Sequence, residues 1–172
     1  MSTKSLADHL NRTLSRLNPG SAPVRTAVVG VGNELHGDDG FGPRIYAQLC
    51  QLMWPKDVEV FNAGIAGLDA LRFLEDCKQV ILVDALANFG NVGEVCLLRP
   101  ENLADRPQRL TGHGLGIPYL LEALKVVRDP LPDILIVGVE IATVKPFSSG
   151  LSDKTEQAVP KTVQLIRGLL SE

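Results

Sequence analysis

Two adjacent carboxylates, Asp38 and Asp39, stand in the glycine-rich stretch GVGNELHGDDGFG, residues 30–42, which follows a run of β-branched residues. Such a loop could cradle a phosphate, cap the next helix or hold a metal ion. A dinucleotide-binding loop needs a third glycine three residues after its second, and Leu35 occupies that position. The two carboxylates would also repel a phosphate, so no nucleotide is expected here.

Capping of the next helix remains open for both acids, because an aspartate before a helix can accept hydrogen bonds from its free N–H groups. Asp84 is different, since it ends the apolar run VILVD at the carboxyl end of an expected strand. An ionised carboxylate is costly there unless it is hydrogen-bonded, paired or bound to a cation. His113 lies between two glycines before an expected helix, so a turn presents its imidazole. Two carboxylates and one imidazole suit a borderline divalent ion.

Alternating apolar runs predict the elements that position these residues. Near-continuous apolar runs are typical of strands buried on both faces, and segments with helical periodicity lie between them. We therefore expect an α/β fold, a three-layer sandwich in which a mostly parallel, about five-stranded twisted sheet is flanked by helices. One strand, at 93–99, follows its predecessor closely and could be antiparallel. The expected strands are 26–32, 58–64, 79–86, 93–99 and 133–141, and the expected helices are 3–17, 40–53, 67–76, 115–127 and 152–170.

The carboxyl ends of the strands are where open α/β sheets bind their ligands. Three of the four exits considered carry an acidic residue, so we expect the site at this edge. These exits are 33–39, 62–67, 84–88 and 140–149.

Composition narrows the class of protein. The 172 residues carry a net charge of -3 with scattered Lys and Arg, so no nucleic acid or anionic membrane is expected as a partner. No apolar run approaches the roughly 18 residues that span a bilayer, and the three separated cysteines are typical of a reduced, cytoplasmic protein. We expect a single domain over 1–172, with an N-terminal helical extension at 1–23 and an α/β core at 24–172.

Three blocks, VVGVGNELHGDDGFGPRI, VILVDAL and TGHGLGIPYLLEAL, together resemble the hydrogenase maturation endopeptidases, which process the large subunit of nickel-iron hydrogenases. The resemblance covers nearly everything from residue 26 onward and implies a protease-like core. It implies that a nickel-loaded precursor of the large subunit is cut once near its C-terminus. The nickel, supplied by the precursor, would be the recognition signal. A non-catalytic nickel-binding assembly chaperone of the same subunit is the alternative.

Metal-binding positions of the family, carried over to this chain, are Asp39, Asp84 and His113. We expect Asp39 to be catalytic as well, and Asp38 to act as a base or to orient the metal ligands. The metal could polarise the carbonyl, activate a water or only position the scissile bond.

Substrate binding is expected at Asn62, Gly64 and Gly67. The two glycines would let a substrate backbone approach closely. The family often has an acid where this chain has Asn62, and Asn cannot act as a base, although its carbonyl could contact metal or substrate.

Overall fold

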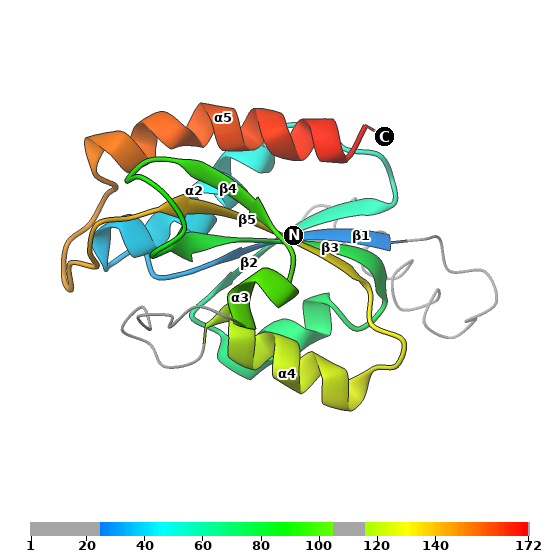
Figure 1. Ribbon diagram of the computed structural model, residues 1–172. Coiled ribbons are helices and arrows are strands. Elements are labelled where there is room, and N and C mark those ends of the chain that lie inside the picture. Colours follow the sequence, from blue (N-terminus) through cyan, green and yellow to red (C-terminus); the bar gives the residue numbers. More distant parts are fainter. Residues whose placement is uncertain (1–24, 105–115, 172) are drawn as a thin grey trace, which may run out of the picture.

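The computed structural model of the protein describes residues 25–104 and 116–171. Figure 1 shows a twisted sheet with helices on both of its faces. The predicted α/β sandwich with a mostly parallel, five-stranded sheet is therefore confirmed. The expected N-terminal helix and His113 lie outside the described residues.

The sheet has the strand order β2-β1-β3-β5-β4. Its first four members are mutually parallel, whereas β4 runs antiparallel to β5, as the close spacing of the strand at 93–99 had suggested. The strands are β1 (Arg25–Val31), β2 (Val58–Gly64), β3 (Cys77–Leu86), β4 (Val95–Leu98) and β5 (Asp133–Glu140).

The strand order puts a switch point beside β1. From β1 the chain builds β2 on one side and then crosses to β3 on the other side. Gly30 of β1 pairs with Val83 of β3, so Asp84, the next residue of β3, lies level with the last residue of β1. The crevice beyond their carboxyl ends is where ligands bind in sheets of this kind.

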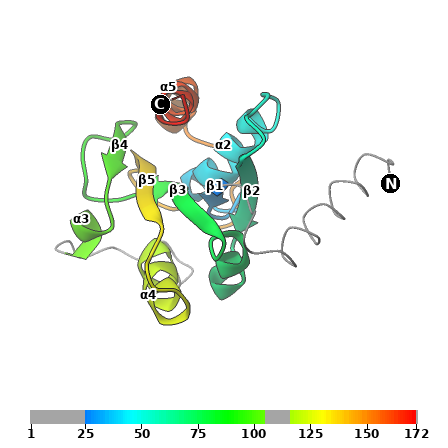
Figure 2. The same cartoon turned by 90° about the vertical axis from the view of Figure 1, so that its right-hand side faces the viewer.

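Helices form the two outer layers, which Figure 2 shows from the end of the sheet. One face is covered by α2 (Phe41–Leu49) and α5 (Asp153–Leu169). The opposite face is covered by the 3-10 helix η2 (Gly67–Phe73), by α3 (Glu101–Ala104) and by α4 (Ile117–Val127). Both faces of β1 and β3 are thus buried, which explains why these strands are nearly continuous apolar runs.

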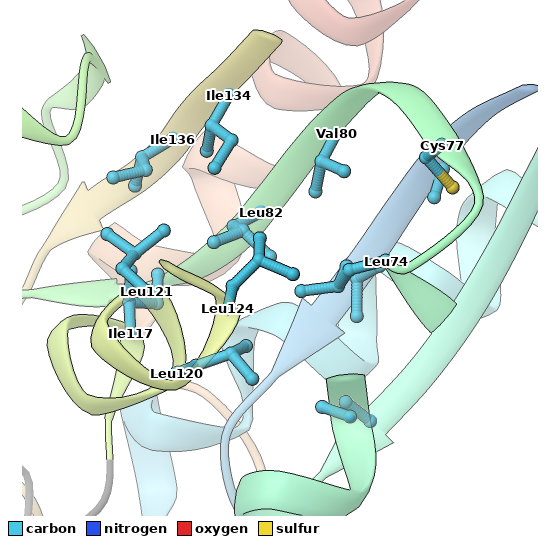
Figure 3. Packing of buried hydrophobic residues seen from close by; sticks show 14 of the residues in the cluster. Leu74, Cys77, Val80, Leu82, Ile117, Leu120, Leu121, Leu124, Ile134 and Ile136 are labelled. Atoms are coloured by element: carbon cyan, nitrogen blue, oxygen red, sulfur yellow. The ribbon is translucent and has the colours of Figure 1, made fainter. Parts of the chain in front are cut away.

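An apolar core fills each of the two interfaces. Figure 3 shows Leu120, Leu121 and Leu124 of α4 packed beside Leu82 and Ile136 of the sheet. Burying a leucine of this kind stabilises the fold by roughly 1.5–3 kcal/mol relative to leaving it exposed. No helix within the described parts of the chain has the length and apolar character needed to cross a membrane.

Two predicted helices end earlier than the sequence pattern suggested. The helix predicted over 40–53 ends at Leu49, and Met53 is 98% exposed instead of forming its last apolar contact. The Leu52 N–H donates to the Leu49 carbonyl at 3.1 Å, and the indole N–H of Trp54 donates to the same carbonyl at 2.9 Å, so a turn follows the helix end. The segment predicted at 67–76 is the 3-10 helix η2, whereas the helix predicted at 152–170 is confirmed as α5.

Candidate active site

Two buried carboxylates from different strand ends face one pocket at the switch point. Asp39 lies in the short 3-10 turn η1 (Gly37–Gly40) that follows β1, and Asp84 lies near the end of β3. Both line a cavity of about 70 Å³, and their exposed fractions are 2% and 6%. The structure therefore brings together two of the residues selected from the sequence.

The other described residues around this cavity are glycine or apolar. Gly64 and Gly67 have φ values of 51° and 55°, a region that side chains rarely adopt, so glycine is favoured at both turns. Four of the twelve described lining residues are glycines, and at these positions no side chain covers the backbone. The lining residues besides the two acids are Val31, Gly32, Ala63, Gly64, Ile65, Gly67, Ala70, Gly116, Ile117 and Leu120.

The glycines of the first loop bring α2 close to the sheet. A Cβ on Gly42 would lie 2.1 Å from the Val31 carbonyl oxygen and 2.5 Å from that of Val83. A Cβ on Gly32, whose φ is 127°, would lie 1.9 Å from the Asp39 carbonyl oxygen. The glycine pattern thus serves close contact between helix, turn and strand, and this contact holds Asp39 above the ends of β1 and β3.

Asp39 is oriented by its own loop. The Asn33 N–H donates to Asp39 Oδ2 at 3.0 Å and also to the Asp39 backbone carbonyl at 3.1 Å. Both acceptors belong to one residue, so the hydrogen bonds restrain the backbone and the side chain of Asp39 together. Its carboxylate is consequently held in place before any ligand arrives.

Asp84 is the electrostatically perturbed member of the pair. Burial raises the pKa of Asp84 well above its ordinary value, the nearby Asp39 raises it further, and a hydrogen bond from the Ala85 N–H to Asp84 Oδ1 at 2.8 Å opposes the increase. Two desolvated carboxylates that repel each other would be stabilised by a bound cation. The oxygen donors therefore fit a divalent ion.

Asp38, although adjacent to Asp39, is turned toward α5. Its Oδ1 accepts the Ser152 N–H at 2.6 Å and its Oδ2 accepts the Ser152 hydroxyl at 2.9 Å. Ser152 is the N-cap residue of α5, and its hydroxyl also lies 3.1 Å from that of Thr155. The sequence left capping of the following helix open for this acid, but the helix end that Asp38 holds is 114 residues away.

The family model for hydrogenase maturation proteases matches residues 43–168. This chain belongs to the hydrogenase maturation protease family. A putative hydrogenase maturation protease of Methanocaldococcus jannaschii is 31% identical over 147 residues, which span 82% of this chain and 93% of that protein. The hydrogenase 2 maturation protease of Escherichia coli is 29% identical, over 87% of this chain and 92% of that one.

A solved structure agrees with these relatives. The hydrogenase maturating endopeptidase HybD of Escherichia coli superposes with a TM-score of 0.74 at 27% identity, over 86% of this chain and 93% of that chain. The resemblance noted from the sequence blocks is thereby confirmed. As a member of this family, the chain belongs to the class of endopeptidases.

The other predicted site residues differ in whether they reach the pocket. Gly64 and Gly67 line the pocket. Asn62 is exposed, and its side-chain oxygen accepts the Gly64 N–H at 3.0 Å, so its observed contact shapes the turn. His113 lies outside the described residues, and Gly116, three positions later, lines the pocket.

Within residues 25–104 and 116–171, no group of three or more His, Cys, Asp or Glu side chains is arranged to hold a metal ion. Asp39 and Asp84 by themselves therefore supply only part of a ligand set. The His113 contribution stays a prediction.

Glu140, at the end of β5, is an acid that sequence reasoning did not single out. It is 5% exposed, and its two carboxylate oxygens accept the N–H groups of Asn88 at 2.7 Å and Phe89 at 2.8 Å. Asn88 has a φ of 73°, in the left-handed region that Asn tolerates, and this bonding fixes the turn after β3. The signal was present, because Glu140 ends an apolar run just as Asp84 does.

Proposed function

We propose that the protein removes a C-terminal peptide from the precursor of a nickel-iron hydrogenase large subunit and recognises the nickel already bound there. The observation that carries this proposal is the pair of buried carboxylates, Asp39 and Asp84, in one pocket whose other described lining residues are glycine or apolar. The mutual repulsion of the pair and its desolvation favour a divalent cation as the group it receives. The curated relatives support the class of substrate, since one is a protease for hydrogenase 2.

In this proposal the nickel belongs to the substrate. Asp39 and Asp84 contribute oxygen ligands, and His113 contributes the third, nitrogen ligand. A partial ligand set without a thiolate suits an ion that arrives with its own ligands from the precursor, and no nucleotide takes part. The ion can then work as an anchor that fixes the scissile bond, because correct positioning alone contributes much of the rate of many enzymes.

The pocket walls suit a polypeptide substrate. Gly64 and Gly67 present backbone without side chains, so an extended chain can pass close to the carboxylates. The proposed chemical step does not require Asp38, whose two oxygens accept hydrogen bonds from Ser152. Its role in this scheme is to hold the turn that carries Asp39.

The test is a cleavage assay with purified nickel-loaded and nickel-free precursor. We expect a shortened large subunit only with the nickel-loaded form. Asp39→Asn, Asp84→Asn and His113→Ala should each lower the rate by at least about a hundredfold. Asp69→Asn is the matched control, because Asp69 is an exposed acid on η2 that does not line the cavity.

Two results would contradict the proposal. Undiminished cleavage by all three variants would remove the proposed ligands from the reaction. A stable complex of wild-type protein and nickel-loaded precursor without any cleavage would instead identify an assembly chaperone that inspects the metal.

A further inference from the structure

Two loops at the carboxyl edge of the sheet are joined by backbone hydrogen bonds. The Gly37 N–H donates to the Ser148 carbonyl at 2.7 Å, and the Ser148 N–H donates to the Leu35 carbonyl at 3.0 Å. His36 and Ser148 form a parallel bridge. We call residues 33–37 and 145–148 the two-loop platform. Its parts come from the exits of β1 and β5.

Phe147 of this platform is exposed and has an unfavourable backbone conformation. Its side chain is 94% exposed and its φ is 57°, in the left-handed region that bulky residues seldom occupy. The ring makes an edge contact with His36, with ring centroids 6.2 Å apart. An aromatic side chain that gains almost no burial and sits on strained backbone contributes little to folding, and its ring is accessible to another molecule.

The platform is connected to the pocket by successive hydrogen bonds. Asn33 donates its N–H to the Asp39 carboxylate, and its own side-chain oxygen accepts the Leu35 N–H at 3.0 Å. Leu35, which is 63% exposed, then accepts the Ser148 N–H. The exposed apolar side chains of Leu35 and Phe147 are therefore carried by the same bonded framework that orients Asp39.

The charges of the platform do not select an acidic or a basic partner. Glu34 and Lys145 are both exposed and carry opposite charges. Apolar contact is thus the main interaction that the platform offers. The pocket itself, at about 70 Å³, has room for only a small part of a protein substrate, so the rest of the substrate must lie outside it.

We propose that Phe147 and Leu35 dock the folded body of the precursor protein, by inserting into an apolar recess on its surface next to the segment that is cut. This inference rests on the proposed function and adds a binding surface to it. Aromatic residues dominate the energetics of many protein interfaces, and a rigid anchor loses little conformational entropy on binding. Phe147 is accordingly the principal contact and Leu35 the lesser one.

The test compares Phe147→Asn with wild type on nickel-loaded precursor. Asn tolerates the left-handed backbone, so the loop keeps its conformation while the aromatic ring is removed. We expect KM and the Kd of the uncut precursor to rise at least about tenfold, with a smaller change in kcat. Leu35→Ser should shift both constants in the same direction by less. The matched control is Met53→Ser, because Met53 is 98% exposed but follows α2 at the opposite end of the sheet.

The outcomes separate docking from catalysis. Unchanged KM and Kd in Phe147→Asn, with an unchanged melting temperature, would overturn the docking role. A change in oligomeric state between wild type and Phe147→Asn would overturn it too, because a second copy of this chain would then be the occupant. If wild type binds the precursor but never cuts it, the proposed protease function fails, while the ratio of the two Kd values still tests docking.

Discussion

Asp84 and Glu140 lie close to the carboxyl ends of neighbouring strands but have different hydrogen-bond partners. Each is a buried acid near the end of an apolar parallel strand, and β3 and β5 are neighbours in the sheet. Glu140 receives two backbone N–H groups from the turn at Asn88 and Phe89. Asp84 receives one, from Ala85, and faces the repulsion of Asp39 across the pocket. A buried carboxylate whose two oxygens both accept backbone N–H groups stabilises the fold. A buried carboxylate with fewer such hydrogen bonds can still bind a ligand.

Cleavage is where the two acids should differ most. Replacing Asp84 with Asn removes a proposed ligand and should reduce kcat/KM for nickel-loaded precursor by at least about a hundredfold. Glu140→Gln keeps one oxygen acceptor for the turn at Asn88 and Phe89 and should reduce kcat/KM by less than about tenfold. Steady-state kinetics of both variants measure the contrast, and equal losses would remove the proposed distinction.

For the free energy of unfolding, we expect substitution of Glu140 to be more damaging than substitution of Asp84. Glu140→Ala leaves the N–H groups of Asn88 and Phe89 without their acceptors and should lower the free energy of unfolding by about 2–3 kcal/mol. Asp84→Asn removes a desolvated charge and should raise it by on the order of 1 kcal/mol in the absence of metal. Chemical denaturation at neutral pH gives both values. A stabilised Glu140→Ala protein would contradict the compensation argument.

The stability difference at Asp84 should depend on pH in one direction. Because the pKa of Asp84 is raised in the folded state, the folded protein holds a proton that the unfolded chain has released above its ordinary pKa of about 3.9. The free energy of unfolding that this group contributes therefore falls as the pH rises from there toward the raised value. The advantage of Asp84→Asn over wild type should be largest at neutral pH and should disappear in acid, which denaturation at a series of pH values will show.

Substitution of Asp38 should have the smallest effects, and comparing them with those of Asp39→Asn separates a structural role from a catalytic one. Asp38→Asn keeps one of the two acceptors for Ser152, so we expect a loss of stability of about 1 kcal/mol and a loss of kcat below about tenfold. Thermal unfolding and cleavage kinetics measure the two effects. A loss of kcat as large as that of Asp39→Asn, without a matching loss of stability, would support the predicted catalytic role of Asp38.

Much of the fold was predictable because strand and helix periods are local properties. The runs TAVVGVG and QVILVDAL are nearly all apolar, as a strand needs when both of its faces are covered, and β1 and β3 coincide with them. The helix boundary at Leu49 was missed because the apolar pattern continues to Met53, beyond a turn in which Leu52 and Trp54 both donate to the Leu49 carbonyl. The strand order could not be deduced, since it depends on which helices cover which face.

The candidate site was predictable only in its residue types. Acids at strand ends marked Asp39 and Asp84, and the same signal was present at Glu140. Whether such an acid faces the pocket depends on the backbone N–H groups that reach it. For Glu140 these come from a turn about fifty residues away, which no local pattern reveals.

By itself the sequence determined the class of fold, the family and the acids that belong to the carboxyl edge, because each is encoded by local pattern and by block order. The family resemblance pointed to Asp39 as the metal-binding acid of the pair in GVGNELHGDDGFG, but only the tertiary structure showed why the two acids differ. Successive residues of the tight turn η1 point in different directions, so Asp39 faces Asp84 while Asp38 reaches Ser152 at the start of α5. That choice depends on contacts between distant segments, which exist only after α2 and α5 have packed on the sheet.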